Sequence, residues 1–241
     1  MKICAAQLKS KSGDIEFNII EHFKLIEKAI GHGAELICFP ELSLTGYEPK
    51  LAKSLCIELN DKRFDPFQKL SDENKIIICV GMPIKAEDGI LIGLVILQPN
   101  TERTLYSKQL LHEDETPFFI PGNNQALIMC GTEIIAPAIC FESIQPSHAS
   151  NVKKQGASIY LASVAKHKLG VNKGYEHYSS ISSEHSYITL MSNCYGYCDN
   201  FESSGSSAVW DKEGNPVAKL SHSENGIVGI DTVSSEPFIA Y

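Results

Sequence analysis

The feature that most constrains the fold is a regular alternation of short apolar runs with polar stretches along almost the whole chain. The apolar runs have the length of strands and the polar stretches repeat with the period of helices, a pattern that is typical of α/β proteins. The predicted strands are 2–8, 35–39, 76–80, 89–98, 101–108, 132–139, 157–164, 187–192, 206–210 and 226–231. The predicted helices are 16–29, 51–74, 151–155 and 175–185. No linker, repeat or low-complexity segment interrupts this order, so we expect residues 1–241 to form one α/β domain.

The first predicted helix shows how apolar side chains set the packing. Apolar residues recur at helical spacing through residues 16–29, and Gly31 and Gly33 supply a stop after them. The face that we expect to be buried carries Ile19, Ile20, Phe23, Ile26 and Ile30. Such a helix requires a sheet or another helix to cover its apolar face.

Composition and charge exclude several classes of protein. Hydrophobic residues make up 43% and charged residues 21% of the 241 residues, which is ordinary globular usage. The formal net charge of −8 argues against nucleic-acid binding, because neutralising phosphates requires clustered Lys and Arg. No window contains the roughly 18 apolar residues of a membrane-spanning helix, and the first residues lack the apolar stretch of a signal peptide. We therefore expect neither a nucleic acid nor a membrane as a partner.

The eight cysteines bear on the compartment. Disulfide frameworks are typical of short secreted chains, and this sequence has neither the length nor the signal peptide of that class. Cys4, Cys38, Cys79 and Cys130 lie inside apolar runs, where reduced cysteine packs as a small hydrophobe. We therefore expect a cytoplasmic protein whose thiols are reduced.

Three chemically reactive side chains share one kind of position, the polar end of a predicted buried strand. Glu41, Lys108 and Cys140 each stand at the end of such a strand or just after it. In α/β sheets, ligands bind in the crevice outside the strand ends. A carboxylate, an ammonium and a thiol that meet there are the parts required for covalent acyl transfer.

The roles of these residues follow from their chemistry. A free thiol has a pKa of about 8.5 and is only slightly ionised at neutral pH, so a nucleophilic Cys140 needs a base or a nearby cation. In this hypothesis Glu41, with its pKa raised by burial, takes the thiol proton and later activates water. Lys108 and a backbone N–H such as that of Phe141 stabilise the oxyanion. The mechanism requires no metal and no cofactor, although single residues of these types are more often solvated charges or packed thiols.

Three segments around these residues resemble the motifs of one family. Residues 39–47, FPELSLTGY, are similar to the glutamate motif of the nitrilase, or carbon–nitrogen hydrolase, superfamily. Residues 106–112, YSKQLLH, are similar to its lysine motif, and residues 137–143, PAICFES, to its cysteine motif. The order Glu, Lys, Cys is the order of the family, and the resemblance covers essentially the whole chain.

The resemblance implies a fold and a set of roles. The fold is a four-layer α-β-β-α sandwich, in which two sheets face each other and helices lie outside. Glu41 is implied as the general base, Lys108 as the oxyanion stabiliser and Cys140 as the nucleophile. Members of the family commonly pair through one helical layer, so a homodimer or a higher homo-oligomer is expected.

A second glutamate at the site is also implied by the resemblance. Residues 115–122, ETPFFIPG, are similar to a family segment in which Glu precedes an aromatic pair and Pro-Gly. Glu115 would orient Lys108 or the substrate nitrogen by a charge-assisted hydrogen bond, and Glu113 is the alternative register. Tyr47 lies in a loop that is expected to form part of the pocket wall, so it is a candidate for substrate binding.

Two segments depart from the family pattern. Many members carry Arg four positions after the nucleophile, where this chain has Ile144. Arg is suited to bidentate carboxylate binding, so its absence disfavours substrates whose carboxylate would be held at that position, including some N-carbamoyl amino acids. Further along, the resemblance implies that Glu184 is a buried hydrogen-bonding group.

The substrate class expected first is a small primary amide, which would form a thioester on Cys140 and release ammonia. A nitrile, which would give a thioimidate, and a carbamoyl or ureido group are alternatives with the same nucleophile. A binding protein that has lost turnover is another alternative, because a fold does not imply a function.

Metal sites are further alternatives. A metal hydrolase would draw its ligands from His112, Glu113, Asp114, Glu115 and His177. The chain has no His-Glu-x-x-His spacing, and consecutive residues do not readily face one ion. Cys194 and Cys198 lack a second cysteine pair at the spacing of a zinc site, so we expect them to pack in the core.

Overall fold

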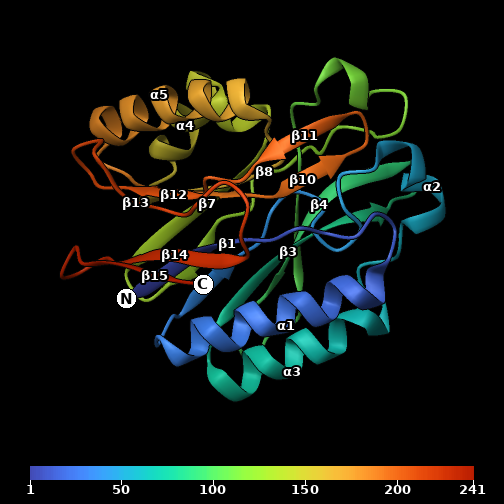
Figure 1. Cartoon of the computed structure of the whole chain (residues 1–241), viewed down its shortest axis with the longest axis horizontal. Helices are drawn as coiled ribbons and strands as arrows, with labels where there is room; N and C mark the ends of the chain where they lie inside the picture. The colour runs from blue at the N-terminus through green and yellow to red at the C-terminus, as the bar shows by residue number, and fades with distance from the viewer.

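The computed structural model describes every residue from Met1 to Tyr241. Two β-sheets lie face to face, and helices cover the outer face of each (Figure 1). Helices α1 (Ile15–Gly31) and α3 (Asp65–Asn74) lie outside the first sheet, whereas α4 (Pro146–Lys154) and α5 (Lys168–His185) lie outside the second. The four-layer α-β-β-α sandwich expected from the sequence is therefore confirmed.

The first sheet has a parallel centre and antiparallel edges. In spatial order its strands are β15 (Pro237–Ala240), β14 (Gly226–Asp231), β1 (Lys2–Gln7), β2 (Leu36–Cys38), β3 (Ile77–Lys85), β4 (Ile90–Leu97) and β5 (Thr104–Ser107). β2 pairs in parallel with both β1 and β3 and is buried along its whole length. A parallel strand covered on both faces reads as a continuous apolar run, which is why the sequence predicted it.

The second sheet repeats this arrangement. Its strands, in spatial order, are β13 (Pro216–Lys219), β12 (Ala208–Trp210), β9 (Ile188–Asn193), β8 (Ile159–Val164), β7 (Glu133–Ile139) and β6 (Ile128–Cys130). β8 pairs in parallel with β7 and β9. A separate two-stranded sheet is formed by β10 (Tyr195–Cys198) and β11 (Phe201–Ser204).

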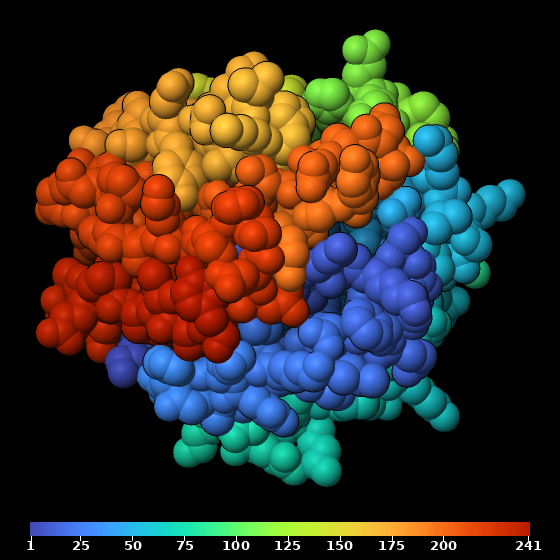
Figure 2. Space-filling model, viewed as in Figure 1, coloured from blue at the N-terminus to red at the C-terminus, as the bar shows by residue number.

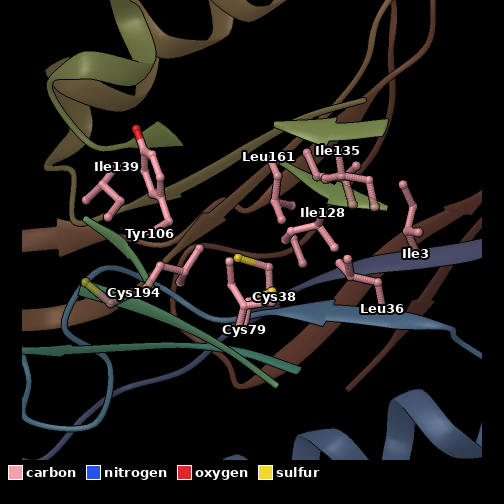
Figure 3. Close-up of a cluster of buried hydrophobic side chains, with 14 of the residues drawn as sticks. Ile3, Leu36, Cys38, Cys79, Tyr106, Ile128, Ile135, Ile139, Leu161 and Cys194 are labelled. Atoms are coloured by element: carbon pink, nitrogen blue, oxygen red, sulfur yellow. The ribbon is translucent and has the colours of Figure 1, made fainter. Parts of the chain in front are cut away.

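The main hydrophobic core lies between the two sheets and takes side chains from both (Figure 3). The first sheet contributes, among others, Ile3, Leu36, Cys38 and Cys79, and the second contributes Ile128, Ile135, Ile139 and Leu161. Fully burying one aliphatic side chain stabilises a fold by roughly 1.5–3 kcal/mol, so this shared core holds the sheets together.

A side chain caps the start of helix α1. The Asp14 side chain accepts a hydrogen bond from the Phe17 N–H at 3.1 Å, which satisfies a donor that the helix leaves free. Ile19 and Ile26 are buried as expected, but Ile20 is 55% exposed, so its predicted place on the buried face is wrong. The buried face instead includes the polar residues Asn18 and His22.

The helix predicted over residues 51–74 is wrong in its first half. The chain forms only one short helix there, α2 (Ala52–Leu55), and then extends so that Ile57 forms a parallel bridge with Ile84 at the end of β3. A residue that pairs with a strand cannot remain helical. Regular helix resumes at α3, after a single 3₁₀ turn over Lys62–Phe64.

The other differences between the predicted and the observed elements concern the starts of two helices and the short strands. α4 and α5 begin earlier than predicted, at Pro146 and Lys168. The strands β6, β10, β11, β13 and β15 were not predicted, and each has three or four residues. Short edge strands carry too few residues for an alternating pattern to stand out.

The β10–β11 hairpin lies against the segment near residue 50. Figure 2 shows its orange atoms next to the cyan atoms of that segment. Lys50 Nζ and Asp199 Oδ1 join the two at 3.0 Å.

None of the helices combines the length and hydropathy needed to cross a membrane.

Candidate active site

Ser163 joins the two strand ends that carry Glu41 and Cys140. The Cys140 N–H donates to the Ser163 carbonyl at 3.0 Å. Ser163 Oγ donates to the Phe39 carbonyl at 2.8 Å, across the interface between the sheets. Phe39 lies just after β2 and two residues before Glu41, so this bond brings the carboxylate and the thiol to the same end of the sandwich.

The turn that carries Glu41 packs tightly on β3. A Cβ atom on Gly81 would overlap the Pro40 carbonyl oxygen and the Leu42 amide nitrogen. Leu42 has a φ of 51°, in the left-handed region. Glycine at position 81 therefore allows the turn to approach the strand, and the turn holds Glu41 inside the protein at 2% exposure.

Lys108 Nζ lies between two buried carboxylates. It is 2.8 Å from Glu41 Oε1 and 2.6 Å from Glu115 Oε1. All three side chains have at most 1% of their surface exposed. Buried charges persist when they are paired and hydrogen-bonded, and this arrangement pairs the ammonium twice. Of the two registers left open by the sequence, Glu115 is the residue beside Lys108, whereas Glu113 is exposed.

Two further donors hold Glu115 in place. Its Oε1 accepts a hydrogen bond from the Tyr47 hydroxyl at 2.9 Å, and its Oε2 accepts one from the His112 N–H at 2.7 Å. Burial raises the pKa of Tyr47, so its hydroxyl stays protonated and remains a donor. Tyr47 thus reaches the site, and its hydroxyl contacts Glu115.

Cys140 occupies a sharp turn directly after β7. Its φ is 47°, which costs a residue other than glycine roughly 1–3 kcal/mol. The Cys140 carbonyl accepts from Ser143 Oγ at 2.6 Å and from the Ser143 N–H at 3.2 Å, which holds the turn. The residue is partly exposed, and its Sγ donates to the Ala165 carbonyl at 3.6 Å. The turn therefore places the sulfur beside a buried charged site.

Glu142 is a residue of the candidate site that the sequence did not predict. Its buried carboxylate accepts hydrogen bonds from the Tyr106 hydroxyl (2.6 Å) and from the N–H groups of Ile139 (2.7 Å), Gln109 (2.7 Å) and Leu110 (3.2 Å). Ile139 directly precedes Cys140, and Gln109 directly follows Lys108. One carboxylate thus joins the segment of the nucleophile to the segment of the lysine. Only its place two residues after Cys140 could have drawn attention to it.

Burial is the main influence on the Glu41 carboxyl group. It raises the pKa of Glu41 to about 7, against the opposing effect of the Lys108 charge and with a further increase from Glu115. Glu41 Oε2 is buried and has no hydrogen-bond partner, whereas Oε1 is bound to Lys108. Glu41 therefore offers one unoccupied oxygen and a proton affinity suited to a base at neutral pH.

The same surroundings favour the neutral form of the Cys140 thiol and the charged form of the Lys108 ammonium. Burial, and then the Glu41 charge, raise the pKa of Cys140 to about 12, although Lys166 and Lys108 oppose the increase. Burial alone would lower the pKa of Lys108, but the charges of Glu41, Cys140 and Glu115 together outweigh it, so the pKa of Lys108 is raised. The Cys140 sulfur is therefore a thiol beside a permanent cation, and it would have to lose its proton in order to act as a nucleophile.

The N–H of Phe141 donates to no carbonyl in the surrounding turn and to no side chain. It follows the nucleophile directly, at the start of the 3₁₀ turn over Glu142–Ile144. A free N–H beside Cys140 and the Lys108 ammonium are the donors that an oxyanion on the attacked carbon would need.

The residues of the metal alternative do not converge. Glu115 points into the site, whereas His112 Nδ1 and Asp114 Oδ1 pair on the surface at 2.6 Å. No group of three or more His, Cys, Asp or Glu side chains could hold a metal ion. Cys194 and Cys198 are buried with their Sγ atoms 3.6 Å apart, and both belong to the core between the sheets.

The expectation for Glu184 is wrong. Its side chain is 65% exposed, because it lies on the outer face of α5. Asn193, at the end of β9, is instead a buried hydrogen-bonding group near the site. Its Oδ1 accepts from the Lys166 N–H at 2.8 Å, and its Nδ2 donates to the Gly205 carbonyl at 2.7 Å.

Comparison with protein families gives a match over nearly the whole chain. The family model described as carbon-nitrogen hydrolase matches residues 2–236. Among curated proteins, the glutamine-dependent NAD(+) synthetase of Thermotoga maritima is 23% identical over 242 residues, which cover 96% of this chain and 42% of that protein. The enzyme of the same name from Aquifex aeolicus is 25% identical over 179 residues, 72% of this chain and 31% of that protein. The chain thus spans less than half the length of these relatives.

Solved structures with the same fold include an amidase from Nesterenkonia sp. AN1. Its complex with butyramide superposes with a TM-score of 0.87 at 18% identity and covers 98% of this chain and 92% of that one. A second structure of the amidase gives a TM-score of 0.86 at 20% identity, with 96% and 92% covered. At this level of identity the likeness shows the fold.

Proposed function

Because the chain belongs to the carbon-nitrogen hydrolase family, we propose that it cleaves the carbon–nitrogen bond of a small primary amide through a thioester on Cys140 and releases ammonia. The observation that carries the proposal is the buried Lys108 ammonium, which lies between Glu41 and Glu115 beside the strained turn of Cys140. The amidase of similar fold was solved with butyramide, which supports an amide as the substrate class.

The first half of the proposed reaction forms the thioester. Cys140 Sγ bonds to the amide carbon while its proton passes to Glu41 Oε2, the oxygen without a partner. Lys108 and the Phe141 N–H donate to the oxyanion, and one such donor is typically worth roughly 3–4 kcal/mol in the transition state. The carbon–nitrogen bond then breaks as Glu41 returns the proton to the nitrogen, so ammonia leaves.

The second half releases the acid. Glu41 takes a proton from water as the water oxygen bonds to the thioester carbon, and the same donors hold the second oxyanion. The carbon–sulfur bond breaks and the proton passes from Glu41 to the sulfur. Glu115 takes part in no proton transfer in the proposed cycle, and its hydrogen bonds with Lys108 and Tyr47 keep the ammonium aimed at the oxyanion.

A second candidate is the side-chain amide of glutamine as an ammonia donor. The curated relatives are glutamine-dependent synthetases, and this chain matches less than half of their length. In that case the ammonia would serve a second reaction in a partner or in a further domain. The chemistry at Cys140 would be the same as for a free amide.

Nitriles and carbamoyl compounds are the alternatives within the family, and a binding protein without turnover is the alternative outside it. An ammonia-release screen over small amides, glutamine, nitriles and carbamoyl compounds, with Cys140→Ala as the control, distinguishes them. We expect the highest kcat/KM with an amide and no ammonia from the Cys140→Ala variant. No release from any compound, together with binding of one of them, would favour the binding protein.

We further propose that residues 1–241 form one carbon–nitrogen hydrolase domain, because both sheets contribute to one core. All eight cysteines are free, which supports a reducing compartment such as the cytoplasm. A homodimer remains the proposed assembly, and analytical ultracentrifugation tests it through the molar mass. A monomer at micromolar concentration would contradict it.

A further inference from the structure

Lys166 is a second buried lysine beside the nucleophile, and it has no carboxylate partner. It follows β8 and is only 6% exposed. Its Nζ donates one hydrogen bond, to the Cys140 carbonyl at 3.3 Å, and takes part in no ion pair. An ammonium has three donors and almost never lies buried without a counter-charge. Two donors of Lys166 are therefore unused beside the reacting sulfur.

The backbone holds Lys166 in a fixed place. Its N–H donates to Asn193 Oδ1 at 2.8 Å, and its carbonyl accepts from Asn193 Nδ2 at 3.1 Å. The same carbonyl accepts from Ser203 Oγ and from the Ser204 N–H, both at 3.0 Å. A backbone fixed by so many bonds makes the ammonium a preorganised donor.

His177, on α5, supplies a second buried polar atom without a partner, and its ring lies close enough to Lys166 to be affected by that charge. Its Nε2 is buried and makes no hydrogen bond. Burial and then the charge of Lys166 lower the pKa of His177, so the ring is neutral at pH 7 and Nε2 can carry the proton that it donates. Lys166, at the Cys140 carbonyl, and His177, within the influence of the Lys166 charge, thus both leave donors unused.

The charges divide the site into two sides. The carboxylates of Glu41 and Glu115 both make their ion pairs with Lys108, and a negative group of a substrate would be repelled there. Lys166 is the stronger of the two cationic influences that oppose the effect of burial on Cys140. A negative group on the substrate would therefore be attracted to the Lys166 side.

We propose that Lys166 and His177 form a carboxylate subsite, so that the preferred substrate is a monoamide of a short dicarboxylic or amino-dicarboxylic acid. The inference rests on the proposed function, because it orients the substrate on Cys140. The amide carbon lies at Sγ, with its nitrogen towards Glu41, and the distal carboxylate supplies the counter-charge that Lys166 lacks.

Matched substrates test this subsite. Succinamate and glutaramate are compared with butyramide and pentanamide, in which a methyl group replaces the carboxylate. In the Lys166→Met variant, which keeps most of the side-chain volume, the ratio of kcat/KM for anionic over neutral amides should fall about 100-fold. His177→Leu should lower the ratio less. Lys168→Met, which removes an exposed charge two residues away, should leave the ratio unchanged.

The kcat/KM ratio of anionic over neutral amides shows whether Lys166 binds the substrate or only supports the turn of Cys140. If Lys166 only positions the Cys140 carbonyl, Lys166→Met slows both amides equally and the ratio stays constant, which would overturn the subsite. Circular dichroism and thermal unfolding establish that each variant is folded. If the protein turns over amides, the change in the kcat/KM ratio of anionic over neutral amides decides between these two roles of Lys166.

Alkylation of Cys140 supplies a readout that needs no turnover. The rates with iodoacetate and iodoacetamide differ mainly in the charge of the reagent, and mass spectrometry assigns them to Cys140. In Lys166→Met the iodoacetate-to-iodoacetamide ratio should fall about 10-fold relative to the wild type. A fall in this ratio without turnover of any amide would uphold the subsite and refute the proposed function. Amide turnover with neither ratio altered would refute the subsite alone.

Discussion

Glu41 and Cys140 hold a single transferable proton between them, and the chemistry depends on where it resides. The pKa of Cys140 is raised to about 12, so the resting sulfur is protonated across the physiological range. The pKa of Glu41 is raised to about 7, so near neutral pH the carboxylate is partly ionised and able to accept that proton. Proton transfer must accompany attack on the substrate, because a free thiolate would lie beside the negative Glu41.

A pH profile follows from the Glu41 pKa. Below about 7 Glu41 is protonated and cannot act as the base, so kcat/KM should fall about tenfold per pH unit on the acid side, with a midpoint near 7. Stopped-flow or coupled ammonia assays between pH 5 and 9 measure this. Glu113→Gln, which removes an exposed carboxylate, is the control and should keep the profile. A rate that is constant down to pH 5 would contradict the role of Glu41.

The sequence predicted some residues of the site and missed others for a physical reason. Glu41, Lys108 and Cys140 were found because each ends a long apolar run, and their motifs resemble one family. Glu142 and Lys166 were missed, because their importance lies in partners that come from distant segments. A carboxylate that accepts donors from two loops looks the same in sequence as a solvated one.

Among the elements, the turn after β7 and the end of β5 work as a pair. Glu142 accepts donors from both, so the position of the lysine relative to the nucleophile depends on one buried carboxylate. Burial raises the pKa of Glu142, while the hydrogen bond from Tyr106 acts in the opposite direction.

Glu142→Gln tests this connection. The amide replaces one acceptor oxygen with an NH₂ group, which leaves at least one buried N–H or hydroxyl without an acceptor. Each such group costs about 1–3 kcal/mol, so we expect a loss of stability in that range together with a lower kcat. Urea denaturation and steady-state kinetics measure the two effects. Glu102→Gln, at an exposed position, should change neither, and an unaltered Glu142→Gln variant would contradict the connection.

The central strands were predictable and the edges were not. β3, β7 and β8 are apolar over most of their length because both of their faces are covered. Each therefore stands out in the sequence as a continuous apolar run. The segment near Ile57 was mistaken for helix because its extended conformation depends on pairing with Ile84, 27 positions away along the chain. The β10–β11 hairpin had no alternating apolar pattern from which its strands could be predicted.

At the scale of the whole molecule, the site exists because two sheets meet. Glu41 and Lys108 follow strands of the first sheet, and Cys140 follows a strand of the second. The alternation of strands and helices predicted an α/β protein, but the division of the strands into two facing sheets was implied only by the resemblance of the motifs. Periodicity records which residues are buried and carries no information on which sheet covers them.

The shared core predicts that both sheets unfold together. Leu161→Ala should cost about 2–5 kcal/mol, because Leu161 is fully buried between the sheets. Met129, which is 55% exposed on β6, gives the control, and Met129→Ala should change stability by less than about 0.5 kcal/mol. In urea, fluorescence of Trp210, which reports on the second sheet, should follow the same transition as circular dichroism. Separate transitions would contradict one domain.

Distant segments of the chain meet around Cys140, and the proposed reaction passes through a covalent intermediate on its sulfur. Rapid quenching during turnover of a primary amide, followed by mass spectrometry of the intact and digested protein, tests it most directly. We predict one added acyl group, located on the peptide that contains Cys140, with ammonia released in equal amount. Cys140→Ala should show no adduct and no ammonia while remaining within about 1–2 kcal/mol of wild-type stability. Ammonia release by the Cys140→Ala variant, or an acyl group on another residue, would contradict the proposed reaction.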